Sequence, residues 1–228
     1  MADKDEKIMI DERELFKNLA QYSNEERKME YIENILKKNI PLETRKIALH
    51  LLGDMHKKKS WYNTAAKYYS DVADLCKTFD EKANFFFQAG EMFVKANDYF
   101  TAEDYFKRVL VLVKPSEKEA YKDKMLNVFI KHAQDFENNK RTASAIQAYN
   151  KILTFKLPID MANKIRDKLI VLYEKIGNIR EANHIRSVKE LAISMAEEEK
   201  AKQKAAEEEK RKEQQELHEG FSTLDEFS

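Results

Sequence analysis

Four alanines recur along this chain at spacings of 37, 43 and 37 residues, and the residues around them recur as well. A small residue stands twelve positions before each of the first three alanines. An aromatic residue stands four positions after each of these alanines. These sets are Ala65, Ala102, Ala145 and Ala182; Gly53, Gly90 and Ala133; and Tyr69, Phe106 and Tyr149. Helices approach closely only where side chains are small, and aromatic rings can fill the adjoining space. The pattern therefore predicts stacked helix pairs that share one core.

The rest of the chain also favours helices. Among 228 residues there are only 4 Gly and 3 Pro, whereas 36% are charged, which is typical of an almost all-helical protein with few turns. Two further helices are predicted at residues 7–21 and 24–38, and Pro41, Pro115 and Pro158 are expected to lie at helix starts. Short links, which make neighbouring helices antiparallel, are expected at residues 59–60, 97–98, 139–140 and 177–178.

The recurring pattern of an apolar residue, a small residue and an aromatic one, then alanine and an aromatic one, resembles the tetratricopeptide repeat. The resemblance covers residues 46 to about 190 and includes three good repeats. A fourth keeps Leu169, Tyr173 and Ala182 but has Ile170 at the small position and Arg186 at the aromatic one. The resemblance implies an all-α, right-handed α-solenoid of antiparallel helix pairs. The family's usual period is about 34 residues, so the longer spacings suggest the SNAP-like branch, adaptors that recruit an AAA ATPase to membrane-fusion complexes.

Four parts are expected along the chain. The apolar stripe stops after Met195, charge pairs four residues apart follow, and Gly220 is expected to end the charged helix. The predicted parts are an N-terminal helical pair packing on the solenoid (1–40), the repeats (41–195), a charged helical arm (196–218) and a flexible terminal peptide (219–228).

The family register predicts a concave groove lined by the first helix of each repeat. The expected lining residues are Ile47, His50, Asp54, Lys57, Asn84, Phe87, Glu91, Val94, Asn127, Ile130, Gln134 and Glu137. Chaperone-binding members grip a peptide's C-terminal carboxylates with a Lys/Asn/Lys/Arg clamp. This chain has His50, Asp54 and Glu91 instead, so such a peptide is not the expected ligand. Mixed charge beside Phe87 and Ile130 favours an apolar or amphipathic helical partner.

Three consecutive phenylalanines, Phe85, Phe86 and Phe87, would cover an arc of roughly 200° on a helix. Surface helices usually bury a stripe little wider than about 100°. The first helix of a tetratricopeptide repeat is packed on two sides, which places Phe86 in the core and Phe85 against an adjacent helix. Phe87 is then either ordinary packing or a ligand contact in the groove.

No motif for catalysis, a cofactor or a metal is found. The chain has no phosphate loop, no dinucleotide-binding glycine fingerprint and no cysteine pair. His50 and Asp54 stand four residues apart on one helix face, but two ligands rarely define a metal site, and a hydrogen bond is the simpler interpretation. A non-enzymatic protein without cofactor or metal is expected.

Charge and apolar content set the remaining expectations. Lys+Arg and Asp+Glu both total 41, so no net basic field would attract nucleic acid or an anionic membrane. No apolar run approaches 18 residues, so no transmembrane segment is expected. The start of the sequence has no apolar signal core and the chain has 1 Cys, which makes the reducing cytoplasm the default compartment.

The end of the sequence carries Phe221, Leu224 and Phe227 at intervals of three residues, after a polar spacer. They form either a short docking peptide or a terminus without a role. The function expected from all these patterns is that of a protein–protein interaction adaptor, with a partner peptide or helix in the groove. The alternative is a SNAP-like adaptor that recruits an AAA ATPase to a membrane-fusion or complex-disassembly machine.

Overall fold

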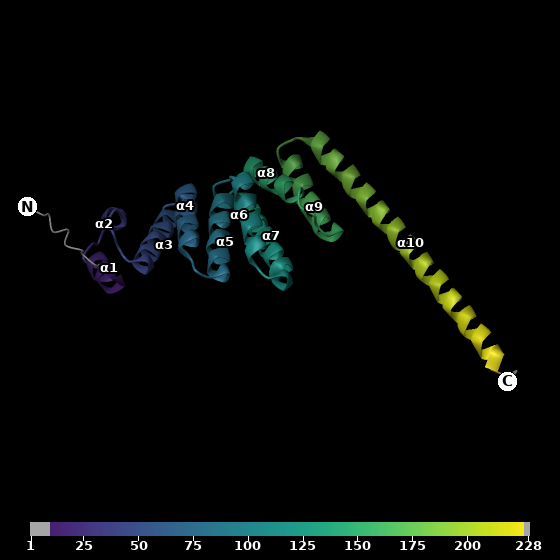
Figure 1. Cartoon of the computed structure of the whole chain (residues 1–228). Helices are drawn as coiled ribbons and strands as arrows, with labels where there is room; N and C mark the ends of the chain where they lie inside the picture. The colour runs from purple at the N-terminus through teal and green to yellow at the C-terminus, as the bar shows by residue number, and fades with distance from the viewer. Residues whose placement is uncertain (1–9, 226–228) are drawn as a thin grey trace, which may run out of the picture. The chain divides into compact units, whose positions relative to one another are not determined.

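The computed structural model describes the backbone of residues 10–225 and the side chains of residues 10–212. Within these limits the chain is an all-α solenoid of tetratricopeptide-like helix pairs, with ten α-helices and one short 3₁₀ helix (Figure 1). The α-helices are α1 (Glu12–Leu19), α2 (Glu25–Leu36), α3 (Leu42–Lys58), α4 (Tyr62–Leu75), α5 (Phe79–Lys95), α6 (Tyr99–Leu112), α7 (Lys118–Asn138), α8 (Thr142–Ile152), α9 (Ile159–Lys175) and α10 (Ile179–Asp225), and η1 (Pro115–Glu117) precedes α7.

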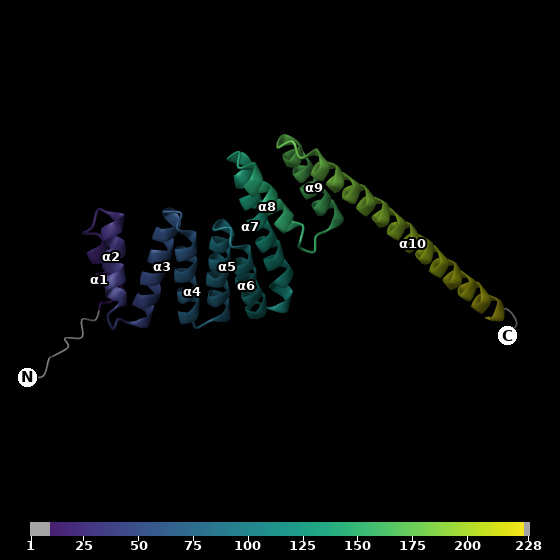
Figure 2. The ribbon, with the colours of Figure 1, turned by 90° about the horizontal axis from the view of Figure 1, so that it is seen from above.

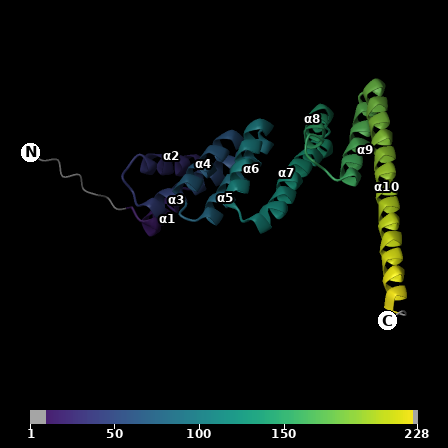
Figure 3. The same cartoon turned by 45° about the vertical axis from the view of Figure 1, so that its right-hand side comes forward.

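The helices form two compact units that divide within α7, between His132 and Ala133. In the first unit α3, α4, α5 and α6 lie side by side in sequence order, each in contact with the next (Figure 2). Helices α1 and α2 both contact α3. In the second unit α9 contacts both α8 and α10, and Figure 3 shows α9 alongside the first part of α10.

The recurring small and aromatic residues meet across the helix pairs α3–α4 and α5–α6. A Cβ atom built on Gly53 would lie 2.8 Å from Cε1 of Tyr69, and one built on Gly90 would lie 2.6 Å from Cε1 of Phe106. Each aromatic residue comes 16 positions after its glycine. The four recurring alanines are all fully buried. The pairing of small and aromatic residues predicted from the sequence is therefore confirmed for these two pairs.

The four predicted links share one backbone structure. In each link one residue has a positive φ, and the next N–H donates to the carbonyl five residues back, which is the Schellman ending of a helix. The positive-φ residues are Ser60 (60°), Asn97 (64°), Lys140 (58°) and Gly177 (78°). The bonds run from Trp61 to His56 (2.9 Å), Asp98 to Phe93 (2.9 Å), Arg141 to Phe136 (2.8 Å) and Asn178 to Tyr173 (2.9 Å). Because these links recur with the spacing of the alanines, the fourth repeat is real despite Ile170 and Arg186.

The starts of several helices follow the sequence. Pro41 and Pro158 stand immediately before α3 and α9, and Pro115 opens η1, as predicted. The predicted helix at 24–38 is α2, whose cap residue Asn24 accepts from the N–H of Glu26 at 2.7 Å. The helix predicted at residues 7–21 is shorter in its described part, since it begins at Glu12 after its cap and ends at Leu19.

The N-terminal helices share one apolar cluster with α3. Leu15 of α1 and Ile32 of α2 are fully buried there together with Ala48 and Leu52 of α3. Burial of such side chains contributes about 1.5–3 kcal/mol each for the larger ones. Helices α1 and α2 therefore depend on α3 for their core.

Helix α10 runs without a break from Ile179 to Asp225, so the expectation that Gly220 ends it is wrong. A flexible peptide was expected from residue 219, but residues 219–225 are helical and residues 226–228 lie outside the described part. Glycine costs a helix only about 1 kcal/mol relative to alanine, and no proline follows it in the sequence. Residues 197–212 are exposed throughout, as expected of a segment without an apolar stripe.

Candidate functional site

The predicted groove residues of α3 and α5 are largely accessible. Asn84 and Lys57 are exposed, whereas His50, Asp54, Phe87 and Glu91 are half-buried. We refer to these six side chains as the α3–α5 face. Val94 was also expected there, but it is fully buried. It lies one helical turn after Gly90 and so faces the partner helix α6.

Asp54 organises the α3 half of this face. Its carboxylate accepts a hydrogen bond from the Tyr69 hydroxyl at 2.6 Å, and His50 Nε2 lies 3.7 Å from the same carboxylate. Burial, and then the bond to Asp54, raise the pKa of Tyr69, so its hydroxyl keeps its proton. The expected hydrogen bond between His50 and Asp54 is not formed, because 3.7 Å is too long for one, and Tyr69 is the hydrogen-bond partner of Asp54 instead. Among the described residues no group of three or more metal-ligating side chains is found.

The three phenylalanines point to different neighbours. Phe85 meets the His50 ring edge-on at 5.2 Å, so it faces α3 as predicted. Phe86 is only 5% exposed and lies 5.8 Å from the Tyr105 ring, which confirms it as a core residue. The ring of Phe87 packs against two other rings, with centroid separations of 5.5 Å to Phe106 of α6 and 6.1 Å to Tyr121 of α7. Part of Phe87 remains exposed, and a ligand could contact it there.

Polar neighbours hold the remaining side chains of α5. Asn84 accepts a hydrogen bond from the Tyr121 hydroxyl at 3.3 Å. Glu91 lies 3.3 Å from Lys95, one turn further along the helix. Both residues therefore belong to the surface, but each already has one intramolecular partner.

The groove residues predicted on α7 are divided between the units. Asn127 is exposed and Ile130 half-buried, and both belong to the first unit. Gln134 is exposed and belongs to the second unit. Glu137, also in the second unit, accepts hydrogen bonds from Tyr149 and Lys168, each at 2.9 Å. Burial opposes its ionisation, but these two bonds lower its pKa, which is typical of a structural ion pair.

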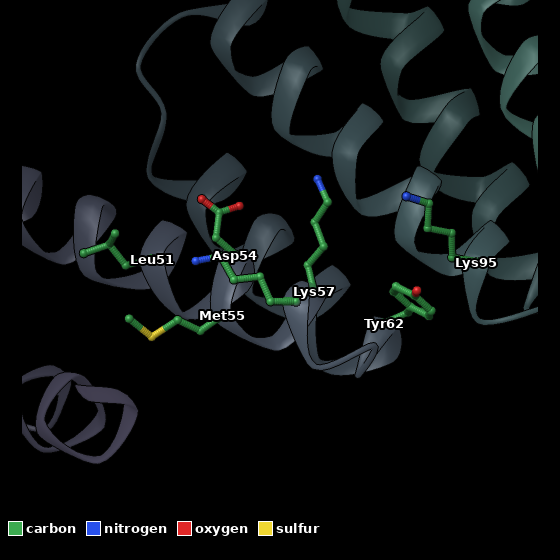
Figure 4. Close-up of a pocket in the computed structure, with 7 residues that line it drawn as sticks. Leu51, Asp54, Met55, Lys57, Tyr62 and Lys95 are labelled. Carbon is green, nitrogen blue, oxygen red and sulfur yellow. The ribbon is translucent and has the colours of Figure 1, made fainter. Parts of the chain in front are cut away.

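A depression of about 480 Å³ opens beside the α3–α5 face, as Figure 4 shows. We call it the lysine pocket. It is lined by Leu51, Asp54, Met55, Lys57, Lys58, Tyr62 and Lys95. The sequence interpretation included Asp54 and Lys57 but missed the others. A signal was present, because Lys58 and Lys95 stand 37 residues apart and are the last residues of α3 and α5.

A buried histidine lies near the same end of α3. His56 is 6% exposed, and its ring lies between Trp61 at 5.3 Å and Tyr68 at 5.2 Å. Within the described part of the chain neither ring nitrogen has a hydrogen-bond partner. Burial lowers the pKa of His56. The charge of Glu33 raises this pKa and that of Lys59 lowers it, each by less than burial does. The ring is therefore neutral at pH 7.

Two further expectations concern the docking peptide at the end of the sequence and the absence of a membrane-spanning helix. Phe221 and Leu224 lie in α10, beyond the residues whose side chains are described, and Phe227 lies outside the described residues, so the docking peptide stays a prediction. None of the helices between residues 10 and 225 combines the length and the apolar character that a membrane span requires.

Comparisons with known proteins add little beyond this geometry. No protein-family model matches the chain, and no curated protein matches it. The crystal structure of MamA is similar over 86% of this chain and 99% of that one, with 18% identity and a TM-score of 0.36. The crystal structure of BtubC (BKLC) from P. vanneervenii is similar over 81% of this chain and 80% of that one, with 10% identity and a TM-score of 0.36. At these scores neither similarity bears on function.

Proposed function

We propose that this chain is a non-enzymatic scaffold that binds a partner protein on the α3–α5 face. The observation that carries the proposal is the fixed arrangement of accessible polar and aromatic side chains on two neighbouring helices. Tyr69 holds Asp54, which lies beside His50, and His50 contacts Phe85. Side chains held in place before binding lose less conformational entropy when a partner arrives, which favours recognition. An amphipathic helix suits this mixture of charge and apolar surface.

Capture of partners from a cell extract tests this proposal. Phe87→Ala removes an accessible ring of the face, and Phe100→Ala is the matched control, because Phe100 is 77% exposed on α6. We expect Phe87→Ala to lose specific partners that both the native chain and Phe100→Ala retain. The proposal is wrong if no partner is captured specifically, or if every captured partner survives Phe87→Ala.

Core damage must be separated from lost binding in that experiment. Phe86→Ala serves this purpose, because Phe86 is buried and truncation of a buried Phe typically costs about 3–5 kcal/mol. Phe87→Ala should cost less stability than Phe86→Ala while weakening capture more. Equal destabilisation by both changes, with capture intact, would assign Phe87 to the core.

A second candidate is a SNAP-like adaptor that recruits an AAA ATPase to a disassembly machine. Helix length favours it, since α3 and α5 have 17 residues each and α4 and α6 have 14. Recovery of an AAA ATPase with the native chain, released when ATP is hydrolysed, supports this candidate. Captured partners without such an ATPase exclude it and leave the general scaffold proposal intact.

A further inference from the structure

The lysine pocket gathers positive charge from two consecutive repeats. Lys57 and Lys58 come from the last turn of α3, and Lys95 is the final residue of α5. Lysines at helix C-termini are favoured by the helix dipole, which accounts for their place on each helix. Figure 4 shows that Lys57 and Lys95 nevertheless belong to the rim of one hollow. Helix preference alone does not require this convergence.

Carboxylates near the pocket pair with two of its three lysines. Lys95 pairs with Glu91 at 3.3 Å, but the pair of Lys58 with Glu25 is long, at 3.9 Å. For Lys57 no ion pair is found among the described residues. The one carboxylate in the lining, Asp54, accepts from the uncharged Tyr69 hydroxyl and lies 3.7 Å from His50 Nε2, so it does not pair with Lys57. Lys57 is therefore the lysine of the pocket that is left to pair with a carboxylate of a partner.

The same hollow also has an apolar side. Leu51 is half-buried and Met55 is 8% exposed, and both line the pocket. The half-buried ring of Tyr62, the first residue of α4, lies on another side. A small inorganic anion would leave this apolar lining in water. A peptide side chain next to the carboxylate would cover it and contribute about 25 cal/mol per Å² of apolar surface buried.

We propose that the lysine pocket binds an Asp or Glu side chain of the partner protein, with an adjacent Leu, Ile or Phe of the same segment on Leu51 and Met55. This inference rests on the proposed scaffold function and specifies the chemistry of its partner. The occupant is an internal acidic and apolar segment, in agreement with the amphipathic helix that suits the α3–α5 face. Electrostatic attraction makes its binding dependent on salt.

An array of synthetic 15-residue peptides, incubated with the full chain, tests the inference. The central position of each peptide is Glu, Asp, Gln or Lys, and its neighbours vary among Leu, Ile, Phe and Ala. We expect bound peptides to be enriched at least tenfold in Glu or Asp beside a large apolar residue. The enrichment should fall at high salt. Equal binding of Glu and Gln peptides, or no binding of any peptide, would overturn the inference.

A pair of charge variants places the effect in the pocket. Lys57→Gln/Lys95→Gln should abolish the acidic preference. The control variant Lys107→Gln/Lys122→Gln removes the same charge from lysines of α6 and α7 that pair with carboxylates of their own helices. This control should retain the preference for acidic peptides. Equal loss of the acidic preference in both double variants would show only a general charge effect and would refute the proposed role of the lysine pocket. Unchanged thermal midpoints confirm that the variants are folded.

The failure of this inference is distinguishable from that of the scaffold proposal. If Lys57→Gln/Lys95→Gln still captures every partner that Phe87→Ala loses, the lysine pocket is not the contact and the scaffold proposal stands. If the native chain captures no specific partner, the scaffold proposal itself is wrong, and the pocket inference falls with it.

Discussion

The substitution Gly90→Ala tests the contact on which the repeat depends. The added Cβ would lie 2.6 Å from Cε1, 2.8 Å from Cδ1 and 3.1 Å from Cζ of the Phe106 ring. Carbon atoms in ordinary contact are about 3.5–4.0 Å apart, so the ring would have to withdraw by about 1 Å. Its retreat is blocked, because it is 4% exposed and packs against Phe87 at 5.5 Å and Phe129 at 5.9 Å.

The expected cost follows from two opposing effects. Overpacking of a buried site typically costs about 1–3 kcal/mol. Replacing glycine by alanine inside a helix regains about 1 kcal/mol of helix propensity. Because Phe106 is held on its far side, we expect the upper part of the overpacking range and a net loss of about 1–2 kcal/mol. Urea unfolding followed by circular dichroism measures this loss as a lower midpoint.

A double-mutant cycle supplies the control. Phe106→Leu removes the ring that the new methyl group would meet, so in that background Gly90→Ala should be neutral or stabilise by up to about 1 kcal/mol. The sign of the alanine effect thus reverses with the ring. If Gly90→Ala raises the midpoint while Phe106 is present, the close approach of α5 and α6 is wrong.

Four further changes address other parts of the fold. Ala102→Leu should overpack a fully buried site and lower the unfolding free energy by about 1–3 kcal/mol, and an unchanged urea midpoint would contradict the repeat register. Gly177→Ala should cost about 1–2 kcal/mol in the same assay despite the open space around it, because φ is 78° there; no loss would mean that the link is not left-handed. Burial lowers the pKa of His56 below its unfolded value of about 6.5, so the unfolded chain gains the proton first as pH falls. Stability should therefore fall below about pH 6.5, by at most about 1.4 kcal/mol per pH unit, and less steeply in His56→Phe; equal slopes in the two proteins exclude this histidine as the cause. Deleting residues 196–228 should leave the melting temperature nearly unchanged, because residues 197–212 are exposed, whereas a fall of several degrees would show that the tail packs on the repeats.

Local and repetitive features of this protein could be predicted from the sequence. Gly53 with Tyr69 and Gly90 with Phe106 obey one spacing, and any spacing that recurs must satisfy the same contact each time. The links at Ser60 and the later equivalent positions are equally local, since a Schellman ending involves only one helical turn and two more residues. The helix pairs, their order and the core alanines therefore follow from the pattern.

Features that depend on where separate helices come together were decided by the tertiary structure. Val94 resembles a groove residue in the family register, but the turn of α5 places it on the buried side with Gly90. Helix α10 continues past Gly220, because one glycine costs a helix only about 1 kcal/mol relative to alanine. The lysine pocket joins Lys58 to Lys95 across 37 residues of sequence, and each lysine alone is an ordinary helix terminus. Periodicity states which residues are equivalent, whereas only the contact between α3, α4 and α5 determines which of them meet.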